Sequence, residues 1–137
     1  MGYRSEVAYV IKFDKPEDRE AYINMMIVAN NEHTTQALKE LSKLEDDKLF
    51  FHADDVKWYD GYEDVKAHTQ IYIQAVELFE GAGYRFTRIG EEMEDIEIEE
   101  DGDYDDLWDY TSINRSIDVC VDDDKLKPIF TDEGELA

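Results

Sequence analysis

Residues 3–13, YRSEVAYVIKF, contain an unbroken apolar run, Val7–Ile11, between polar ends. A strand that is apolar on both faces is typical of the interior of a sheet, where both faces are covered. We therefore expect residues 3–13 to form a central strand, around which the other elements are arranged.

Two helices are expected directly after this strand. Residues 16–27 begin with a proline and two acids, which are favoured in a first turn, and continue with apolar residues at helical spacing. A second helix is expected to begin at Thr34, whose side chain can cap it. Its apolar side would consist of Leu38, Leu41 and Leu44.

The longest helical pattern covers residues 62–80, where apolar side chains recur every three or four positions before a glycine. Residues 48–58 and 84–89 are rich in apolar and aromatic residues and predict strands on either side of this helix. The first of these strands is expected to bend at Asp54–Asp55. Further strands are expected over residues 94–99 and 110–121.

The predicted order is β-α-(α)-β-α-β-β-β. It indicates an α+β fold in which two or three helices pack on one face of a mostly antiparallel sheet. Residues 1–121 are expected to form a single domain. Residues 122–137 contain Pro128 and Gly134 and are expected to be an irregular, partly flexible C-terminal segment.

Cysteine content and hydropathy favour a soluble, cytoplasmic protein. The chain has one cysteine, Cys120, so no disulfide can form within it. Cys120 alternates with Val119 and Val121 and is interpreted as a structural thiol. The apolar run Val7–Ile11 is too short for a signal peptide or a membrane span.

Negative charge dominates the composition, with 36 acidic against 14 basic residues. Residues 1–90 hold 17 acids and 11 bases, whereas residues 91–137 hold 19 acids and 3 bases. This balance disfavours direct binding to nucleic acid or to anionic membranes, because both present phosphates. A basic protein is the natural partner.

The acidic run, residues 91–109 (EEMEDIEIEEDGDYDDLWD), has 12 acids and no base. Blocks of like charge are usually disordered. Here, however, Ile96 and Ile98 alternate with acids, which predicts a half-buried strand, and aromatic residues interrupt the later part. We interpret the acidic run as an ordered surface.

Partner binding is predicted to depend on the carboxylates of the acidic run and on two aromatic anchors, since Trp and Tyr are common interface anchors and carboxylates steer a basic partner. The candidate residues are Glu91, Glu92, Glu94, Asp95, Glu97, Glu99, Asp101, Asp103, Tyr104, Asp105, Asp106, Trp108 and Asp109.

A calcium site is the obvious alternative use of these acids. Asp101, Asp103 and Asp105 match the first three ligands of an EF-hand loop. The sixth and twelfth positions are Asp106 and Ser112 in place of the required glycine and glutamate. We therefore predict no dedicated metal site and no cofactor.

Catalysis finds little support in the sequence. His52, Asp54, Asp55 and His68 could form a metal or acid–base cluster if they come together, which keeps a divalent-metal-dependent enzyme open as an alternative. The chain has no glycine-rich phosphate loop before a helix and no nucleophile signature. We expect a binding protein rather than an enzyme.

The leading hypothesis is an acidic inhibitor whose carboxylates mimic nucleic-acid phosphates and block a basic nucleic-acid-handling protein. An immunity protein for a basic nuclease toxin would use the same chemistry. An accessory or structural protein whose acidity serves only solubility is a further alternative.

The segments MGYRSEVAYVIKF (residues 1–13) and FHADDVKWYDGYEDV (residues 51–65) resemble small uncharacterised proteins of tailed bacteriophages. This resemblance carries no functional motif to individual residues. It implies antagonism of a host defence, such as anti-restriction or anti-CRISPR activity, in the cytoplasm of a bacterial host.

Overall fold

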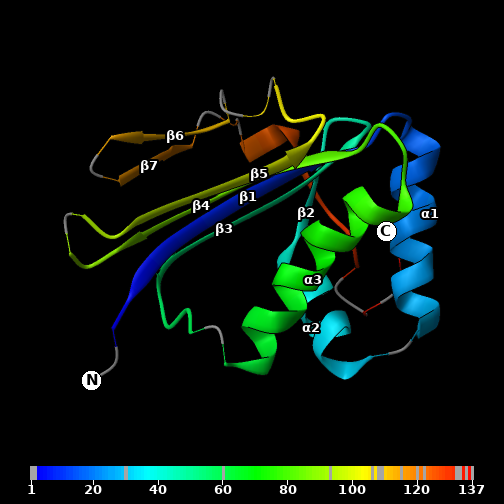
Figure 1. The fold of residues 1–137 in the computed structure, drawn as a ribbon. Coiled ribbons are helices and arrows are strands. Elements are labelled where there is room, and N and C mark those ends of the chain that lie inside the picture. Colours follow the sequence, from blue (N-terminus) through cyan, green and yellow to red (C-terminus); the bar gives the residue numbers. More distant parts are fainter. Residues whose placement is uncertain are drawn as a thin grey trace.

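The computed structural model describes residues 3–29, 31–59, 61–92, 94–105, 107, 110–114, 116–119, 121, 123–131, 134 and 136. Within them, a six-stranded antiparallel sheet carries α-helices on one face and a two-stranded hairpin on the other (Figure 1). The expected α+β class, with helices on one face of a mostly antiparallel sheet, is confirmed. None of the helices described is long and apolar enough to cross a membrane.

The strands of the sheet lie in the order β5-β4-β1-β3-β2-β8. Their bounds are β1 (Ser5–Lys12), β2 (Ser42–Leu44), β3 (Lys48–Val56), β4 (Gly83–Gly90), β5 (Ile96–Gly102) and β8 (Leu126–Pro128). The helices are α1 (Pro16–Ala29), α2 (Glu32–Glu40) and α3 (Glu63–Leu78), and a short 3-10 turn, η2, covers Asp123–Lys125. The hairpin consists of β6 (Thr111–Asn114) and β7 (Ser116–Val119).

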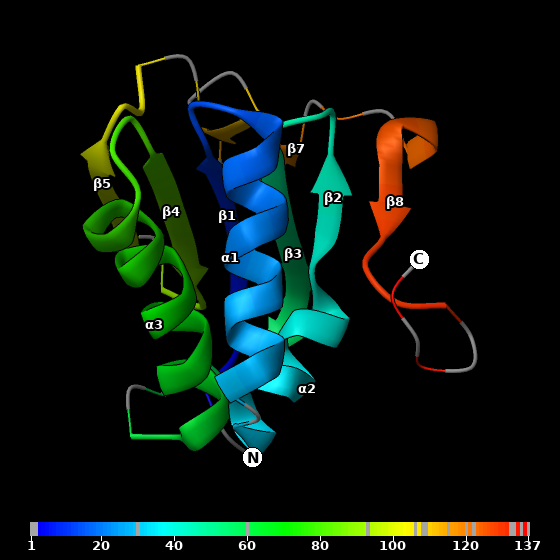
Figure 2. The same ribbon diagram turned by 90° about the vertical axis from the view of Figure 1, so that its right-hand side faces the viewer.

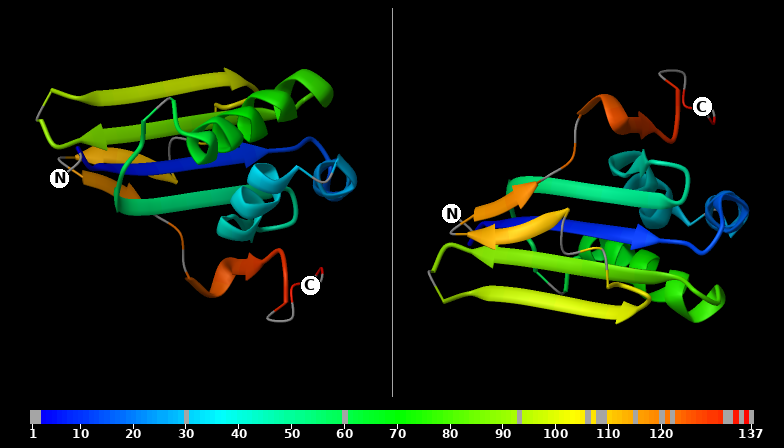
Figure 3. Two further views of the ribbon diagram at one scale, coloured as in Figure 1. Left: turned by 90° about the horizontal axis from the view of Figure 1, so that it is seen from below. Right: turned by 90° about the horizontal axis from the view of Figure 1, so that it is seen from above.

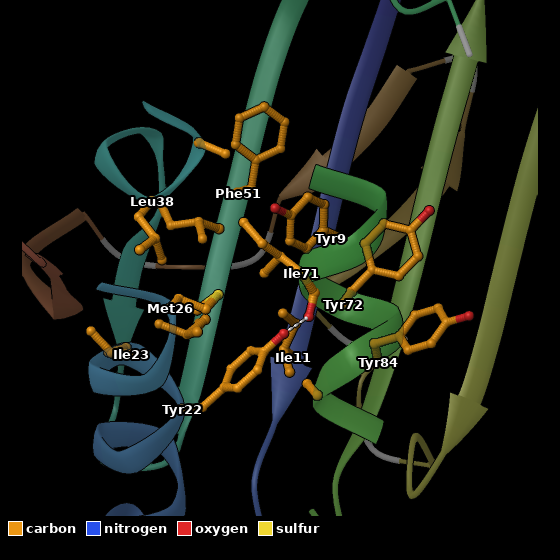
Figure 4. Close-up of a cluster of buried hydrophobic side chains, with 14 of the residues drawn as sticks. Tyr9, Ile11, Tyr22, Ile23, Met26, Leu38, Phe51, Ile71, Tyr72 and Tyr84 are labelled. Atoms are coloured by element: carbon orange, nitrogen blue, oxygen red, sulfur yellow. Dashed lines mark hydrogen bonds between the residues drawn. The ribbon is translucent and has the colours of Figure 1, made fainter. Parts of the chain in front are cut away.

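β1 is the central strand that its apolar run predicts. It pairs with β3 on one side and β4 on the other, and residues 7–11 are fully buried. Val7, Tyr9 and Ile11 point into the main core beneath the helices, where Tyr22 and Ile71 meet them (Figure 4). Burial of these side chains supplies the main favourable term in folding.

A second, smaller core lies on the opposite face of the sheet, which we call the hairpin face (the other is the helix face). Val10, Leu44, Phe50 and Leu107 form its buried centre. Leu107 belongs to the acidic run and is 0% exposed. The end of the acidic run is therefore anchored on the sheet by an apolar side chain.

The second helix begins earlier than predicted. The Asn31 side chain accepts hydrogen bonds from the backbone amides of His33 and Thr34, at 3.0 and 3.1 Å, and caps α2. The helix ends at Glu40, because the backbone of the next residue, Leu41, is extended. Leu44 then lies in β2 instead of on the helix, so the predictions of a Thr34 cap and of a helical Leu44 were wrong.

The segment expected to be irregular, residues 122–137, contains a strand of the sheet. β8 pairs with β2, and Ile129 just after it is 1% exposed within the main core. A three-residue strand is too short to show a period in the sequence. Cys120 lies outside the described residues.

Candidate partner-binding surface

The acidic run supplies the outermost strand of the sheet. In the described part of the chain β5 pairs with β4 alone, at one edge of the sheet (Figure 2). Every residue from Ile96 to Gly102 is exposed. The predicted strand is confirmed, but the expected half-burial of its isoleucines is wrong, because Ile96 and Ile98 are 47% and 49% exposed. An edge strand has one neighbour instead of two, and neither the helices nor the hairpin bury its side chains.

The register of β5 on β4 assigns its side chains to the two faces of the sheet. Glu97, Glu99 and Asp101 stand opposite Arg88, Phe86 and Tyr84. Tyr84 and Phe86 belong to the main core, so these three acids, the acidic row of β5, lie on the helix face. Since side chains alternate along a strand, those of Ile96, Ile98 and Glu100 lie on the hairpin face.

A hydrogen-bonded ion-pair network fixes the start of β5. Arg88 Nη2 donates to Asp95 Oδ1 at 2.7 Å, and Arg88 Nε donates to Glu97 Oε1 at 2.9 Å. The Tyr3 hydroxyl also donates to Asp95 Oδ2, at 2.7 Å. The hydrogen bonds from Arg88 and then from Tyr3 lower the pKa of Asp95. Asp95 and Glu97 therefore help to hold the β4–β5 hairpin together.

Two further candidate residues also make contacts within the fold. Asp103 accepts from Lys12 Nζ at 3.4 Å, and Glu91 accepts from the backbone amide of Arg4 at 2.7 Å. Glu100, which was not among the candidates, pairs with Arg85 Nη1 at 2.8 Å. Bases of the first 90 residues thus neutralise part of the acidic run, which the uneven charge distribution alone did not indicate.

Some candidate carboxylates make no ion pair with the residues that the structure describes. They are Glu91, Glu92, Glu94, Glu99, Asp101 and Asp105, the unpaired carboxylates. All six are exposed. No ion pair among the described residues neutralises their charge, although Glu91 accepts a hydrogen bond from the Arg4 amide and Glu99 accepts one from the Tyr84 hydroxyl.

A groove of about 440 Å³ lies beside the acidic row, between α3 and β5. Aromatic side chains of Trp58, Tyr72 and Phe86 line it, together with the carboxylates of Glu97 and Glu99. Burial, together with these two carboxylates, raises the pKa of the Tyr72 phenol. Lys66, Thr69 and Gln70 complete the lining, so the groove combines aromatic side chains with two carboxylates and one ammonium group.

Of the two predicted aromatic anchors, Tyr104 and Trp108, the structure describes Tyr104. Tyr104 is half-buried and packs against the second core, where it contributes to folding. Asp106, Trp108 and Asp109 lie outside the described residues. Sequence reasoning missed the groove, because Trp58, Tyr72 and Phe86 come from distant segments that only the fold brings together.

The proposed His52–His68 cluster is not formed, because the two rings lie on opposite faces of the sheet. His52 Nε2 is 2.9 Å from Glu6 Oε2 on the hairpin face. His68 is buried on the helix face, with Nδ1 2.6 Å from the Tyr9 hydroxyl and Nε2 2.9 Å from Glu40 Oε1. The two histidines therefore cannot belong to one metal or acid–base cluster.

Metal ligands were also sought across the part of the chain that the structure describes. There, no group of three or more His, Cys, Asp or Glu side chains is arranged to hold a metal ion. Of the acids that match an EF-hand loop, Asp103 pairs with Lys12, and Asp101 accepts from the backbone amide of Gly102.

Comparison of the chain with protein-family models, with curated proteins and with solved structures finds no match. The geometry and charge of the surface around β5 are therefore the basis for inferring a function.

Proposed function

We propose that this protein is an acidic inhibitor that occupies the nucleic-acid site of a basic nucleic-acid-handling protein. The observation that carries the proposal is the position of the acidic run, which forms the exposed outermost strand of a folded sheet. Carboxylates held in this way offer acceptors to lysine and arginine side chains without nucleic acid. The bacteriophage resemblance makes antagonism of a host defence, such as restriction or CRISPR, the natural setting.

The acidic row has the length of a short stretch of phosphates. Alternate residues of a strand lie about 6.8 Å apart, and phosphates of one duplex strand follow each other every 3.4 Å or so along the axis. The row from Glu97 to Asp101 thus places three carboxylates over about 14 Å, the axial length of roughly four phosphates, and Arg88 pairs with one of the three. The other unpaired carboxylates, at the β4–β5 turn and after β5, lengthen this negative surface.

The excess charge also determines how binding should respond to salt. Exposed charges attract a basic partner over long distances and accelerate association. Salt screens this attraction, with a Debye length of about 8 Å at physiological ionic strength. A complex formed mainly through the unpaired carboxylates should therefore dissociate as salt is raised, and DNA should compete with it.

The experiment is an affinity capture from bacterial lysate with three forms of the protein, at low and high salt and with competing duplex DNA. The first form is wild type. The surface variant removes four unpaired carboxylates: Glu92→Gln, Glu94→Gln, Glu99→Gln and Asp101→Asn. The charge-matched control removes four exposed acids that form no ion pair with the described residues: Glu17→Gln, Asp46→Asn, Glu77→Gln and Glu80→Gln.

Wild type and the control should capture the same basic nucleic-acid-handling protein, and salt or DNA should release it. The surface variant should lose most of this capture although its net charge equals that of the control. Equal capture by the surface variant would show that these unpaired carboxylates are not the binding surface. Capture of a single nuclease toxin instead would favour an immunity protein.

A further inference from the structure

The outer edge of β5 carries backbone groups with no strand beside them in the described structure. Backbone hydrogen bonds run from the Gly90 amide to the Asp95 carbonyl, at 2.8 Å, and from the Asp103 amide to the Ala82 carbonyl, at 3.1 Å. In an antiparallel pair such bonding alternates along the strand. Residues 95, 97, 99, 101 and 103 therefore bond to β4, and residues 96, 98, 100 and 102 face outward. Of the four outward amides, those of Ile96 and Gly102 donate to the Glu94 carbonyl and to the Asp101 carboxylate, which leaves those of Ile98 and Glu100 for another strand.

The two edge strands of the sheet, β5 and β8, differ in length and in how well they are protected from pairing with a further strand (Figures 2 and 3). β8, at the opposite edge, has three residues and ends at Pro128, which lacks an amide hydrogen. Short strands and proline are common means of protecting an edge from further pairing. β5 has seven residues, all exposed, and its sequence IEIEEDG contains no proline.

We propose that β5 accepts an extended segment of the basic partner as an additional strand of the sheet. This inference depends on the proposed function in one respect: the partner is taken to be basic. It adds the means of recognition, in which backbone groups of β5 supply hydrogen bonds and its side chains supply specificity.

The two faces of β5 define the sequence pattern of the segment that fits. On the helix face the new side chains would lie next to Glu97, Glu99 and Asp101, where lysine or arginine gives favourable cross-strand pairs. On the hairpin face they would lie next to Ile96 and Ile98, where apolar residues cover the exposed isoleucines. The segment should therefore alternate basic and apolar residues.

A second copy of this chain does not fit the same edge. Pairing of β5 with β5 would bring carboxylates of the two acidic rows near one another, and like charges directly opposite are destabilising. The acids that attract a basic strand thus also oppose self-association through this edge.

The test uses two capped, fluorescent seven-residue peptides of the same composition. One has lysine at odd and valine at even positions, and the other has four lysines followed by three valines. Fluorescence anisotropy should show that the alternating peptide binds about tenfold more tightly, since the block peptide cannot combine ladder hydrogen bonds with matched side chains. Equal affinities would overturn strand addition, because charge alone would then explain binding.

Two variants at one outward-facing position separate the backbone from the side chain. Ile98→Pro removes an outward amide and leaves the bonds to β4 in place, since proline is tolerated on an edge strand whose amide faces solvent. Ile98→Pro should lower the affinity for the alternating peptide by about tenfold, whereas Ile98→Ala should change this affinity by only about threefold. Undiminished binding by Ile98→Pro would overturn the proposal.

Amide exchange in the wild-type protein gives a readout that does not depend on folding of a variant. The bound alternating peptide should slow exchange of the Ile98 and Glu100 amides, and unchanged exchange would overturn strand addition. The lysate capture is a separate test: retained salt-sensitive capture by Ile98→Pro would refute strand addition and leave the proposed function standing.

Discussion

Leu107→Ala tests whether the acidic run is anchored on the sheet. Leu107 is 0% exposed and packs with Val10, Leu44 and Phe50 in the second core. Truncation of a buried leucine to alanine costs about 2–5 kcal/mol, the sum of lost burial and of the cavity that remains. Since native domains are stable by only about 5–15 kcal/mol, the loss should be easily measured.

The expected shift in melting temperature follows from the chain length of 137 residues. At about 2.1 cal/mol/K per residue, the unfolding entropy is roughly 0.29 kcal/mol/K, so a loss of about 3 kcal/mol lowers the melting temperature by about 10 °C. Thermal and urea unfolding by circular dichroism would measure both quantities. Leu78→Ala, at a side chain that is 54% exposed, is the matched control. A Leu107→Ala variant as stable as Leu78→Ala would refute the anchoring.

Two further predictions concern hydrogen bonds on the helix face and at the start of β5. Tyr9→Phe removes the hydroxyl that lies 2.6 Å from Nδ1 of the buried His68. The free energy of unfolding should fall by about 1–3 kcal/mol. A loss equal to that of Tyr62→Phe, at an exposed tyrosine, would contradict this hydrogen bond. The lowered pKa of Asp95 means that its stabilisation is present above the unfolded-state pKa of about 3.9 and is lost as pH falls through the lower folded-state pKa. Urea unfolding between pH 5 and 2 should therefore depend less on pH in Asp95→Asn than in Asp46→Asn, and equal dependence in both would contradict the Arg88–Asp95 contact.

Much of the fold could be predicted from local patterns. The apolar run of β1 required a central strand, and the bend at Asp54–Asp55 corresponds to a register shift opposite β1, with Asp55 at φ 56°. The long periodic segment became α3. These elements have enough residues for a period to be visible, whereas β2 and β8, with three residues each, do not.

The surface was less predictable than the fold, because its properties depend on contacts between distant segments. Alternation of Ile96 and Ile98 with acids correctly indicated a strand, but periodicity cannot distinguish a covered strand from an edge strand. Which carboxylates are paired depends on Arg88, which is close in sequence, and on Lys12, which is 91 residues from Asp103. Only the register of β5 on β4 and β4 on β1 brings these groups together.

Residue-resolved amide hydrogen exchange along β5 in the free protein tests most directly whether a folded scaffold holds the acidic run. The amides of Glu97, Glu99 and Asp101 should exchange slowly because they bond to β4, and those of Ile98 and Glu100 should exchange quickly because they face outward. Exchange of all five at the rate of an unstructured peptide would contradict the account.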